Sequence, residues 1–151
     1  MRIEKMTVTA TRILERDSAH RVLRHESKCA TLHGHRYRAE IECEAPELDA
    51  VGRVVDFGVV KEVVGAWIDE NWDHTTLVNQ RDTRLCEFTV DEHAAGKRAP
   101  YIFVGEPTAE NIAKELADVA FKLLHEKSAA LTVRRVRVYE TPNCFAEVVF
   151  T

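Results

Sequence analysis

The sequence predicts one α+β domain, in which two strands are followed by two helices and then by two further strands. Three observations support this prediction. Residues 33–45 alternate between apolar and charged side chains, residues 107–127 repeat apolar side chains at the helical period, and residues 131–150 contain two β-rich segments around a Thr-Pro-Asn turn. At 151 residues, with 45% hydrophobic residues, the chain is long enough to bury one core, so we expect residues 1–151 to form a single domain.

The first two elements are predicted strands. Residues 6–14, MTVTATRIL, are rich in β-branched side chains and are expected to form the first strand. The second strand covers residues 33–45, where the odd positions run from His33 and His35 into an apolar series and the even positions carry Arg and Glu. Because successive side chains of a strand point to opposite faces, one face is apolar, and the two histidines open it.

Two helices are predicted to follow. The first covers residues 56–72, with Asp56 as N-cap, and the second covers residues 107–127, with Thr108 as N-cap. Residues 78–106 lie between them, lack a clear period and are expected to form a loop or a partly extended excursion. The apolar positions expected to face a sheet are Phe57, Val60, Val64, Trp67 and Ile68 in the first helix, and Ile112, Ala113, Leu116, Val119, Ala120, Leu123 and Leu124 in the second.

The last two strands, residues 131–140 and 144–150, are predicted to form a hairpin. Alternation places Glu140 on the same side as Val136 and Val138, so a carboxylate continues an apolar face. A buried carboxylate needs partners, and a ligand with two adjacent N–H donors would supply them. The alternative is that the strand ends here and Glu140 reaches water.

Composition excludes several classes of function. The net charge is −4, with 21 basic and 25 acidic side chains, which argues against a nucleic-acid partner. No apolar run approaches the roughly 20 residues that span a bilayer, and the N-terminus lacks the order of a signal peptide, so we expect a cytoplasmic protein without a membrane partner. The cysteines are therefore expected as thiols. Cys43 and Cys144 are interpreted as small buried hydrophobes, and Cys86 has no assigned role.

His20, His33 and His35 are candidate metal ligands. Side chains two apart on a strand share a face, so His33 and His35 can bind one ion, and an antiparallel neighbour would bring His20 alongside. Three imidazoles with one open position are typical of a catalytic zinc site. The alternative is three surface histidines near a turn.

Three further residues are candidates for proton transfer. Cys29 lies four residues before His33, where a thiol near a metal acts as base or nucleophile; its alternative role is a buried hydrophobe. Asp73 and His74 are adjacent, and an aspartate can orient an imidazole for proton transfer. The alternative for this pair is a polar cluster at the end of a helix.

Six motifs occur in the order found in one known family: SAH, CATLHGH, VVDFGVVK, WDHTTL, PTAEN and YET. Together they resemble the 6-pyruvoyl-tetrahydropterin synthase family, in particular its bacterial 6-carboxy-tetrahydropterin synthase branch. The resemblance covers nearly the whole chain apart from residues 78–106. One departure is ERDSAH, where Arg16 and Asp17 stand in a region that the family usually fills with an aromatic and small residues.

The resemblance implies a fold and a site. The fold is the tunnelling fold, a four-stranded antiparallel sheet with two helices on one face, which assembles into homo-oligomeric rings, commonly hexamers, with sites at subunit boundaries. Arg24, Lys28 and Arg36 are available near the site to neutralise a triphosphate, and the alternative for at least one of them is a solvated surface charge. The implied residues are the Zn²⁺ ligands His20, His33 and His35, the catalytic residues Cys29, Asp73 and His74, and the pterin-binding residues Glu140 and Thr108.

The implied function is that of a zinc-dependent lyase acting on a small molecule. It would convert 7,8-dihydroneopterin triphosphate to 6-carboxy-5,6,7,8-tetrahydropterin, acetaldehyde and triphosphate, an early step of 7-deazaguanine (queuosine-type) synthesis. Two alternatives stay open: a pyruvoyl-forming synthase with the same zinc site, and a non-catalytic, zinc-stabilised module that binds a pterin or purine.

Overall fold

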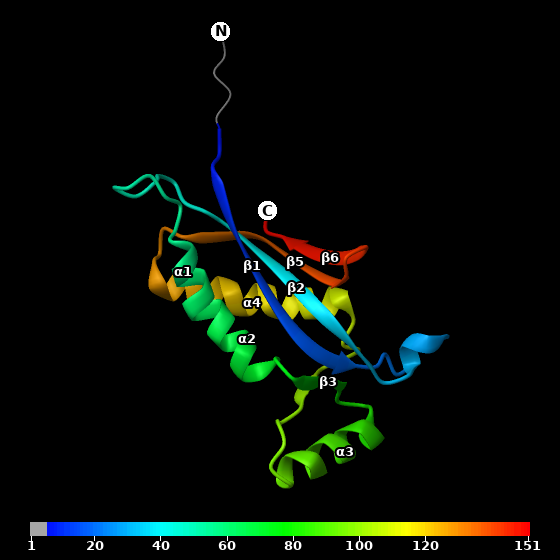
Figure 1. The fold of residues 1–151 in the computed structure, drawn as a ribbon. Coiled ribbons are helices and arrows are strands. Elements are labelled where there is room, and N and C mark those ends of the chain that lie inside the picture. The colour runs from blue at the N-terminus through cyan, green and yellow to red at the C-terminus, as the bar shows by residue number, and fades with distance from the viewer. Residues whose placement is uncertain (1–5) are drawn as a thin grey trace.

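A six-stranded mixed sheet crosses the molecule in the order β4-β3-β1-β2-β5-β6 (Figure 1). The structure is a computed structural model and describes residues 6–151, so the first five residues of the predicted domain lie outside the described residues. The strands are β1 (Thr9–His20), β2 (His33–Glu44), β3 (Thr75–Asn79), β4 (Tyr101–Phe103), β5 (Thr132–Thr141) and β6 (Cys144–Val149). The helices are the 3-10 turn η1 (Lys28–Ala30), α1 (Phe57–Val60), the π-helical turn η2 (Lys61–Gly65), α2 (Ala66–Asn71), α3 (Thr83–Ala94) and α4 (Ala109–Lys127).

Four of the strands, β1, β2, β5 and β6, are antiparallel neighbours, in agreement with the predicted connectivity. The prediction of a four-stranded antiparallel sheet is nevertheless wrong, because β3 and β4 add two parallel strands at the β1 side. Parallel neighbours need a long connection, and α3 provides it between β3 and β4. The sheet is therefore mixed.

Helix α3 corrects the prediction that residues 78–106 are a loop, and it makes a third helix where two were expected. Asp82 caps it, since the side chain of Asp82 accepts a hydrogen bond from the backbone N–H of Leu85 at 3.2 Å. Within α3 only Leu85 and Thr89 are buried. A helix that buries so little needs few apolar positions, which explains why its period is weak in the sequence.

The α1–α2 segment and α4 cover one face of the sheet, as Figure 1 shows. The odd positions of β2 from Tyr37 onward are buried beneath them, which confirms the predicted alternation. The prediction that Phe57 belongs to the core is wrong, because 51% of the residue is exposed. The prediction that Cys144 is buried is also wrong, because this residue is exposed. The largest buried side chains of this core are Trp72, Tyr37, Ile41, Ile68, Leu77, Ile112, Leu116 and Leu124.

Strand β1 extends six residues beyond its predicted end at Leu14. Its second half carries charged side chains, so this part of the sequence lacks the apolar pattern that indicates a strand. Asp17 lies on the outer face, whereas Arg16 turns inward and is 3% exposed. The Arg16 guanidinium lies 4.7 Å from the ring centroid of Tyr37 and 4.2 Å from that of Trp72, so two aromatic faces stabilise its charge. The strand can therefore continue to His20.

Helix α4 begins where the sequence predicts. Thr108 is the N-cap, accepting a hydrogen bond from the backbone N–H of Asn111 at 3.3 Å, and Glu110 lies in the first turn. Such a cap contributes about 1 kcal/mol. It also fixes the segment before α4 against the end of β1. Among residues 6–151, no helix combines the length and apolarity that a membrane-spanning segment needs.

Candidate active site

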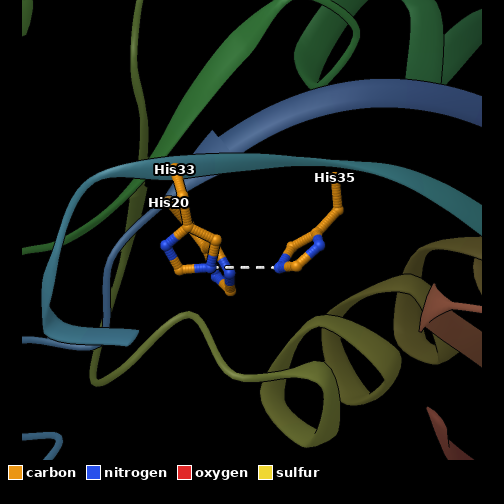
Figure 2. A group of neighbouring side chains, drawn as sticks. All are labelled: His20, His33 and His35. Carbon is orange, nitrogen blue, oxygen red and sulfur yellow. Dashed lines mark hydrogen bonds between the residues drawn. The ribbon is translucent and has the colours of Figure 1, made fainter. Parts of the chain in front are cut away.

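Three histidines meet where β1 ends and β2 begins (Figure 2). His20 is the last residue of β1 and pairs directly with His33, the first residue of β2. His35 lies two positions further on the same face. The ring centroids are 4.7 to 5.2 Å apart, and one nitrogen from each ring lies within 4.8 Å of the other two. The antiparallel register thus brings together the three predicted metal ligands.

Backbone carbonyls fix the orientation of two of these rings. The Nδ1 atom of His20 lies 2.7 Å from the carbonyl oxygen of Pro107, and that of His33 lies 2.6 Å from the carbonyl oxygen of Thr31. A carbonyl only accepts, so each Nδ1 must carry the proton and each neutral ring keeps its lone pair at Nε2. Figure 2 shows the Nε2 atoms of His33 and His35 facing each other, 3.1 Å apart.

The surroundings of His20 and His35 favour the neutral form of these two imidazoles. Burial, with smaller contributions from neighbouring imidazoles, lowers the pKa of His20 to about 4. Burial and then the proximity of His33 lower the pKa of His35. Within the described residues the Nε2 atom of His20 is buried without a hydrogen-bond partner, which is uncommon for a polar atom. Three imidazole nitrogens, one of them lacking a partner, are a donor set that fits Zn²⁺ with one position left open.

A cavity of about 280 Å³ lies beside His20. Cys29, Thr108 and Glu140 all line it, so the structure brings together three further predicted site residues. An Oε1 atom of Glu140 lies 3.8 Å from Nε2 of His20. Burial, followed by repulsion from Glu110, raises the pKa of Glu140, as expected for a carboxylate short of partners. The full lining is His20, Val22, His25, Cys29, Thr108, Ala109, Glu110, Glu140, Cys144 and Phe145.

Asp73 and His74 form the predicted pair but lie outside this cavity. Their side chains meet at 3.0 Å between Oδ2 of Asp73 and Nδ1 of His74. Both residues form hydrogen bonds with the backbone of Asp17. The Asp17 N–H donates to Oδ1 of Asp73 at 3.2 Å, and the Asp17 carbonyl accepts from the backbone N–H of His74 at 2.7 Å. The side chain of His74 is 71% exposed, and its backbone has a φ of 53°, in the left-handed region.

His74 lines a different cavity, of about 430 Å³, together with Asp17, Gly34 and Arg36. Burial opposes ionisation of Asp73, but hydrogen bonds from His74 and from the Asp17 N–H outweigh it and lower the pKa of Asp73. An ionised Asp73 can therefore orient and stabilise the imidazole beside it. Four of the eight predicted site residues, His20, Cys29, Thr108 and Glu140, thus line the cavity beside His20, whereas His35 and His74 line the other cavity.

Other residues at the site were not predicted. Pro107 and Thr31 act through their carbonyl groups, which carry no side-chain signal in a sequence. Glu106 holds the loop that carries Cys29; its place immediately before the Pro-Thr helix start is the only sequence signal that could have found it. Of the predicted basic residues, Arg24 is exposed, and Arg36 lies in the cavity of His74.

The same sheet and helices recur in solved tunnelling-fold structures. An uncharacterized protein from Wolinella succinogenes superimposes with a TM-score of 0.81 at 20% identity, covering 97% of this chain and all of that one. The 6-pyruvoyl tetrahydropterin synthase of Caenorhabditis elegans superimposes with a TM-score of 0.69, also at 20% identity, covering 99% of this chain and all of the other. The fold of this protein is therefore that of the tunnelling-fold class.

The chain belongs to the 6-pyruvoyl tetrahydropterin synthase family, whose family model matches residues 9–149. It is 41% identical over 141 residues to the 6-carboxy-5,6,7,8-tetrahydropterin synthase of Rickettsia bellii, covering 93% of this chain and 99% of that protein. It is 29% identical over 140 residues to the protein of the same name from Bacillus subtilis, covering 93% and 78% of the two chains. The protein is thus a pterin synthase.

Proposed function

We propose that this chain is a zinc-dependent 6-carboxy-5,6,7,8-tetrahydropterin synthase. The substrate is 7,8-dihydroneopterin triphosphate, and the products are 6-carboxy-5,6,7,8-tetrahydropterin, acetaldehyde and triphosphate. The observation that carries the proposal is the cavity lined by Cys29, Glu140 and His20, whose ring packs against those of His33 and His35. The relatives from Rickettsia bellii and Rickettsia conorii, both named 6-carboxy-5,6,7,8-tetrahydropterin synthase, support the carboxy-forming branch.

His20, His33 and His35 would hold the zinc ion. A bound Zn²⁺ acts as a Lewis acid, lowering the pKa of hydroxyl groups and polarising carbonyl oxygens. The protein contributes ligand orientation, because the carbonyls of Pro107 and Thr31 hold two of the rings with Nε2 free.

Glu140 and Thr108 bind the pterin ring. The carboxylate of Glu140 accepts from two adjacent N–H donors on the ring, which supply the partners that its half-buried position lacks. The hydroxyl oxygen of Thr108 accepts from the Asn111 N–H, so its own hydrogen is free to donate to the ligand. Together the two side chains orient the ring so that its side chain points toward the histidines.

Cys29 and His74 move the protons. Cys29, as thiolate, removes a proton from the substrate side chain, and His74, oriented by Asp73, carries a second one. Loss of triphosphate and internal tautomerisation are followed by hydrolytic carbon–carbon cleavage, in which one water supplies the second carboxylate oxygen and the aldehyde hydrogen, to give the carboxylated product and acetaldehyde. His74 can act on the same substrate as Cys29 only from another copy of the chain, because it lies outside the Cys29 cavity.

The proposal therefore includes a homo-oligomer, a hexamer, with sites at subunit interfaces. Three free strand edges support it: among residues 6–151, Thr9–Asp17 of β1 is paired only with β2, β4 only with β3, and β6 only with β5. Free edges are surfaces on which another copy can pair. Mixing Cys29→Ala with His74→Ala protein under exchange conditions should restore activity, since some mixed sites would contain both intact residues. No recovery, in a mixture shown to contain mixed oligomers, would contradict shared sites.

The reaction itself is tested by incubating zinc-replete protein with 7,8-dihydroneopterin triphosphate and identifying the pterin by mass spectrometry. Acetaldehyde and the 6-carboxy product support the proposal, whereas a pyruvoyl product without acetaldehyde assigns the protein to the other branch. Cys29→Ala separates the enzyme from a non-catalytic zinc module. The enzyme should keep zinc and lose turnover; a structural site with Cys29 as fourth ligand should lose zinc and become unstable.

A further inference from the structure

The loop between His20 and His33 carries the Cys29 thiol and is closed by its own hydrogen bonds. The backbone N–H of Val22 donates to the carbonyl of Cys29 at 2.9 Å, and the N–H of His25 donates back to Val22 at 3.0 Å. The position of the thiol is therefore set by the turn at residues 22–25. Any group that fixes this turn also fixes Cys29.

Glu106 is the group that contacts this turn. Its Oε2 atom accepts from the backbone N–H of Leu23 at 2.8 Å, and its Oε1 atom accepts from that of Arg24 at 3.2 Å. The side chain is 14% exposed, so water competes little for these charge-assisted bonds. The backbone of Glu106 is fixed in turn, because its carbonyl accepts from the side-chain amide of Asn111, in the first turn of α4, at 2.8 Å.

Pro107, the residue after Glu106, contacts the histidine cluster. The carbonyl of Pro107 accepts from the Nδ1 atom of His20, at 2.7 Å. Two consecutive residues therefore fix the two halves of the site, the thiol loop and the buried histidine. Because consecutive Cα atoms across a trans peptide are only about 3.8 Å apart, the two anchors extend from neighbouring points of the backbone.

We propose that Glu106 is a positioning residue that fixes the Cys29 thiol relative to the three histidines. The inference rests on the proposed function, in which Cys29 and a zinc ion act on one substrate. A displacement of about 1 Å at a reacting group can cost on the order of a hundredfold in rate. Removing Glu106 should therefore lower kcat while leaving the pterin contacts of Glu140 and Thr108 in place.

The test compares Glu106→Ala and Glu106→Gln with a matched control, Asp49→Ala. Asp49 also accepts from two loop N–H groups, those of Val51 and Arg53, both at 3.0 Å, but in the loop after β2 rather than beside His20. In zinc-loaded protein, Glu106→Ala should lower kcat by about tenfold to a hundredfold. KM should stay within about threefold, since substrate binding is retained. Glu106→Gln keeps one side-chain acceptor, so its kcat should lie between those of wild type and Glu106→Ala. The kcat of Asp49→Ala should match that of wild type.

Two measurements accompany the kinetics: zinc content, which should be unchanged, and amide hydrogen exchange of residues 22–30, which should rise in Glu106→Ala but not in Asp49→Ala. Unchanged kcat, unchanged exchange, or loss of zinc together with activity would each overturn the positioning role. The exchange measurement does not depend on turnover. If the wild-type protein forms no pterin product while exchange still responds, the proposed function is wrong and the anchoring of the loop by Glu106 stands.

Discussion

Asp82 joins the start of α3 to Arg21, the residue that follows His20. Its side chain is 2% exposed and accepts two hydrogen bonds from Arg21, Nε to Oδ2 and Nη2 to Oδ1, both at 2.6 Å. Its Oδ1 atom also accepts from the N–H of Leu85 as the helix cap. Replacing Asp82 by alanine removes all three bonds at once.

The expected loss of stability can be worked out from these contacts. The cap contributes about 1 kcal/mol. Breaking a fully buried ion pair costs about 3–5 kcal/mol, but the side chain of Arg21 is 24% exposed, so water can solvate part of the unpaired guanidinium. We therefore assign about 2 kcal/mol to the pair, and expect Asp82→Ala to lower the free energy of unfolding by about 3 kcal/mol.

Asp56→Ala is the matched control. Asp56 also caps a helix, accepting from the Gly58 N–H at 2.8 Å, and also pairs with an arginine, Arg53, at 3.3 Å. Its side chain is 57% exposed, so the pair adds little and the loss should be about 1 kcal/mol. Urea unfolding at equal m-values measures both variants. If the losses of unfolding free energy in Asp82→Ala and Asp56→Ala agree within about 0.5 kcal/mol, the buried Arg21–Asp82 pair contributes no more than the exposed one, and the reasoning is refuted.

The same pair has a pH signature. The hydrogen bonds from Arg21, which outweigh the effect of burial, lower the pKa of Asp82. A carboxyl group with a lowered folded-state pKa contributes stability above its unfolded pKa of about 4 and loses it as pH falls through the folded value. The stability difference between wild type and Asp82→Ala should therefore be constant near neutral pH and shrink in acid. A difference that persists unchanged in acid would contradict this linkage.

Three further predictions concern the site. His35→Ala should weaken zinc binding by more than about a hundredfold, measured by competition with a chelator. Tyr37→Phe should leave the free energy of unfolding within about 1 kcal/mol of wild type or raise it, measured by urea unfolding, because the buried hydroxyl has no hydrogen-bond partner among the described residues. Asp73→Asn should lower kcat by about 10²- to 10⁴-fold in steady-state kinetics, because an amide cannot stabilise a charged His74.

Each of these has a contrary outcome. Unchanged zinc affinity in His35→Ala would remove that ring from the ligand set. A loss of more than about 2 kcal/mol in Tyr37→Phe would mean that its hydroxyl has a partner, such as an ordered water. Full activity in Asp73→Asn would exclude the pair from proton transfer, and His33→Ala serves as a positive control for loss of activity through the metal.

The elements that sequence reasoning predicted correctly are those whose burial is periodic. β2 and α4 each bury one complete face, so their periods of 2 and 3.6 are visible in the residues themselves. α3 was missed because only Leu85 and Thr89 are buried in it. β3 was missed because its parallel pairing with Ser18–His20 depends on a partner far away in the chain, and no local pattern records such a partner.

The candidate site also contains a part that could be predicted from the sequence and a part that could not. His33 and His35 share a strand, so their convergence followed from alternation alone, and the register of β1 with β2 then added His20. The anchoring contacts could not be predicted, because the carbonyls of Pro107 and Thr31 are common to every residue type. The separation of His74 from Cys29 could not be predicted from motif order either, since it depends on which face of β1 each segment approaches.

At His74, the residue that is best for stability differs from the residue that the proposed proton transfer needs. Within residues 6–151, His74 is the one non-glycine residue with a positive φ. The left-handed region costs most side chains about 1–2 kcal/mol, whereas asparagine tolerates it better. A redesign that scored stability alone would therefore choose asparagine here, raise the melting temperature slightly and discard the proposed proton carrier. Thermostabilised variants of this protein should be screened for turnover first at this position.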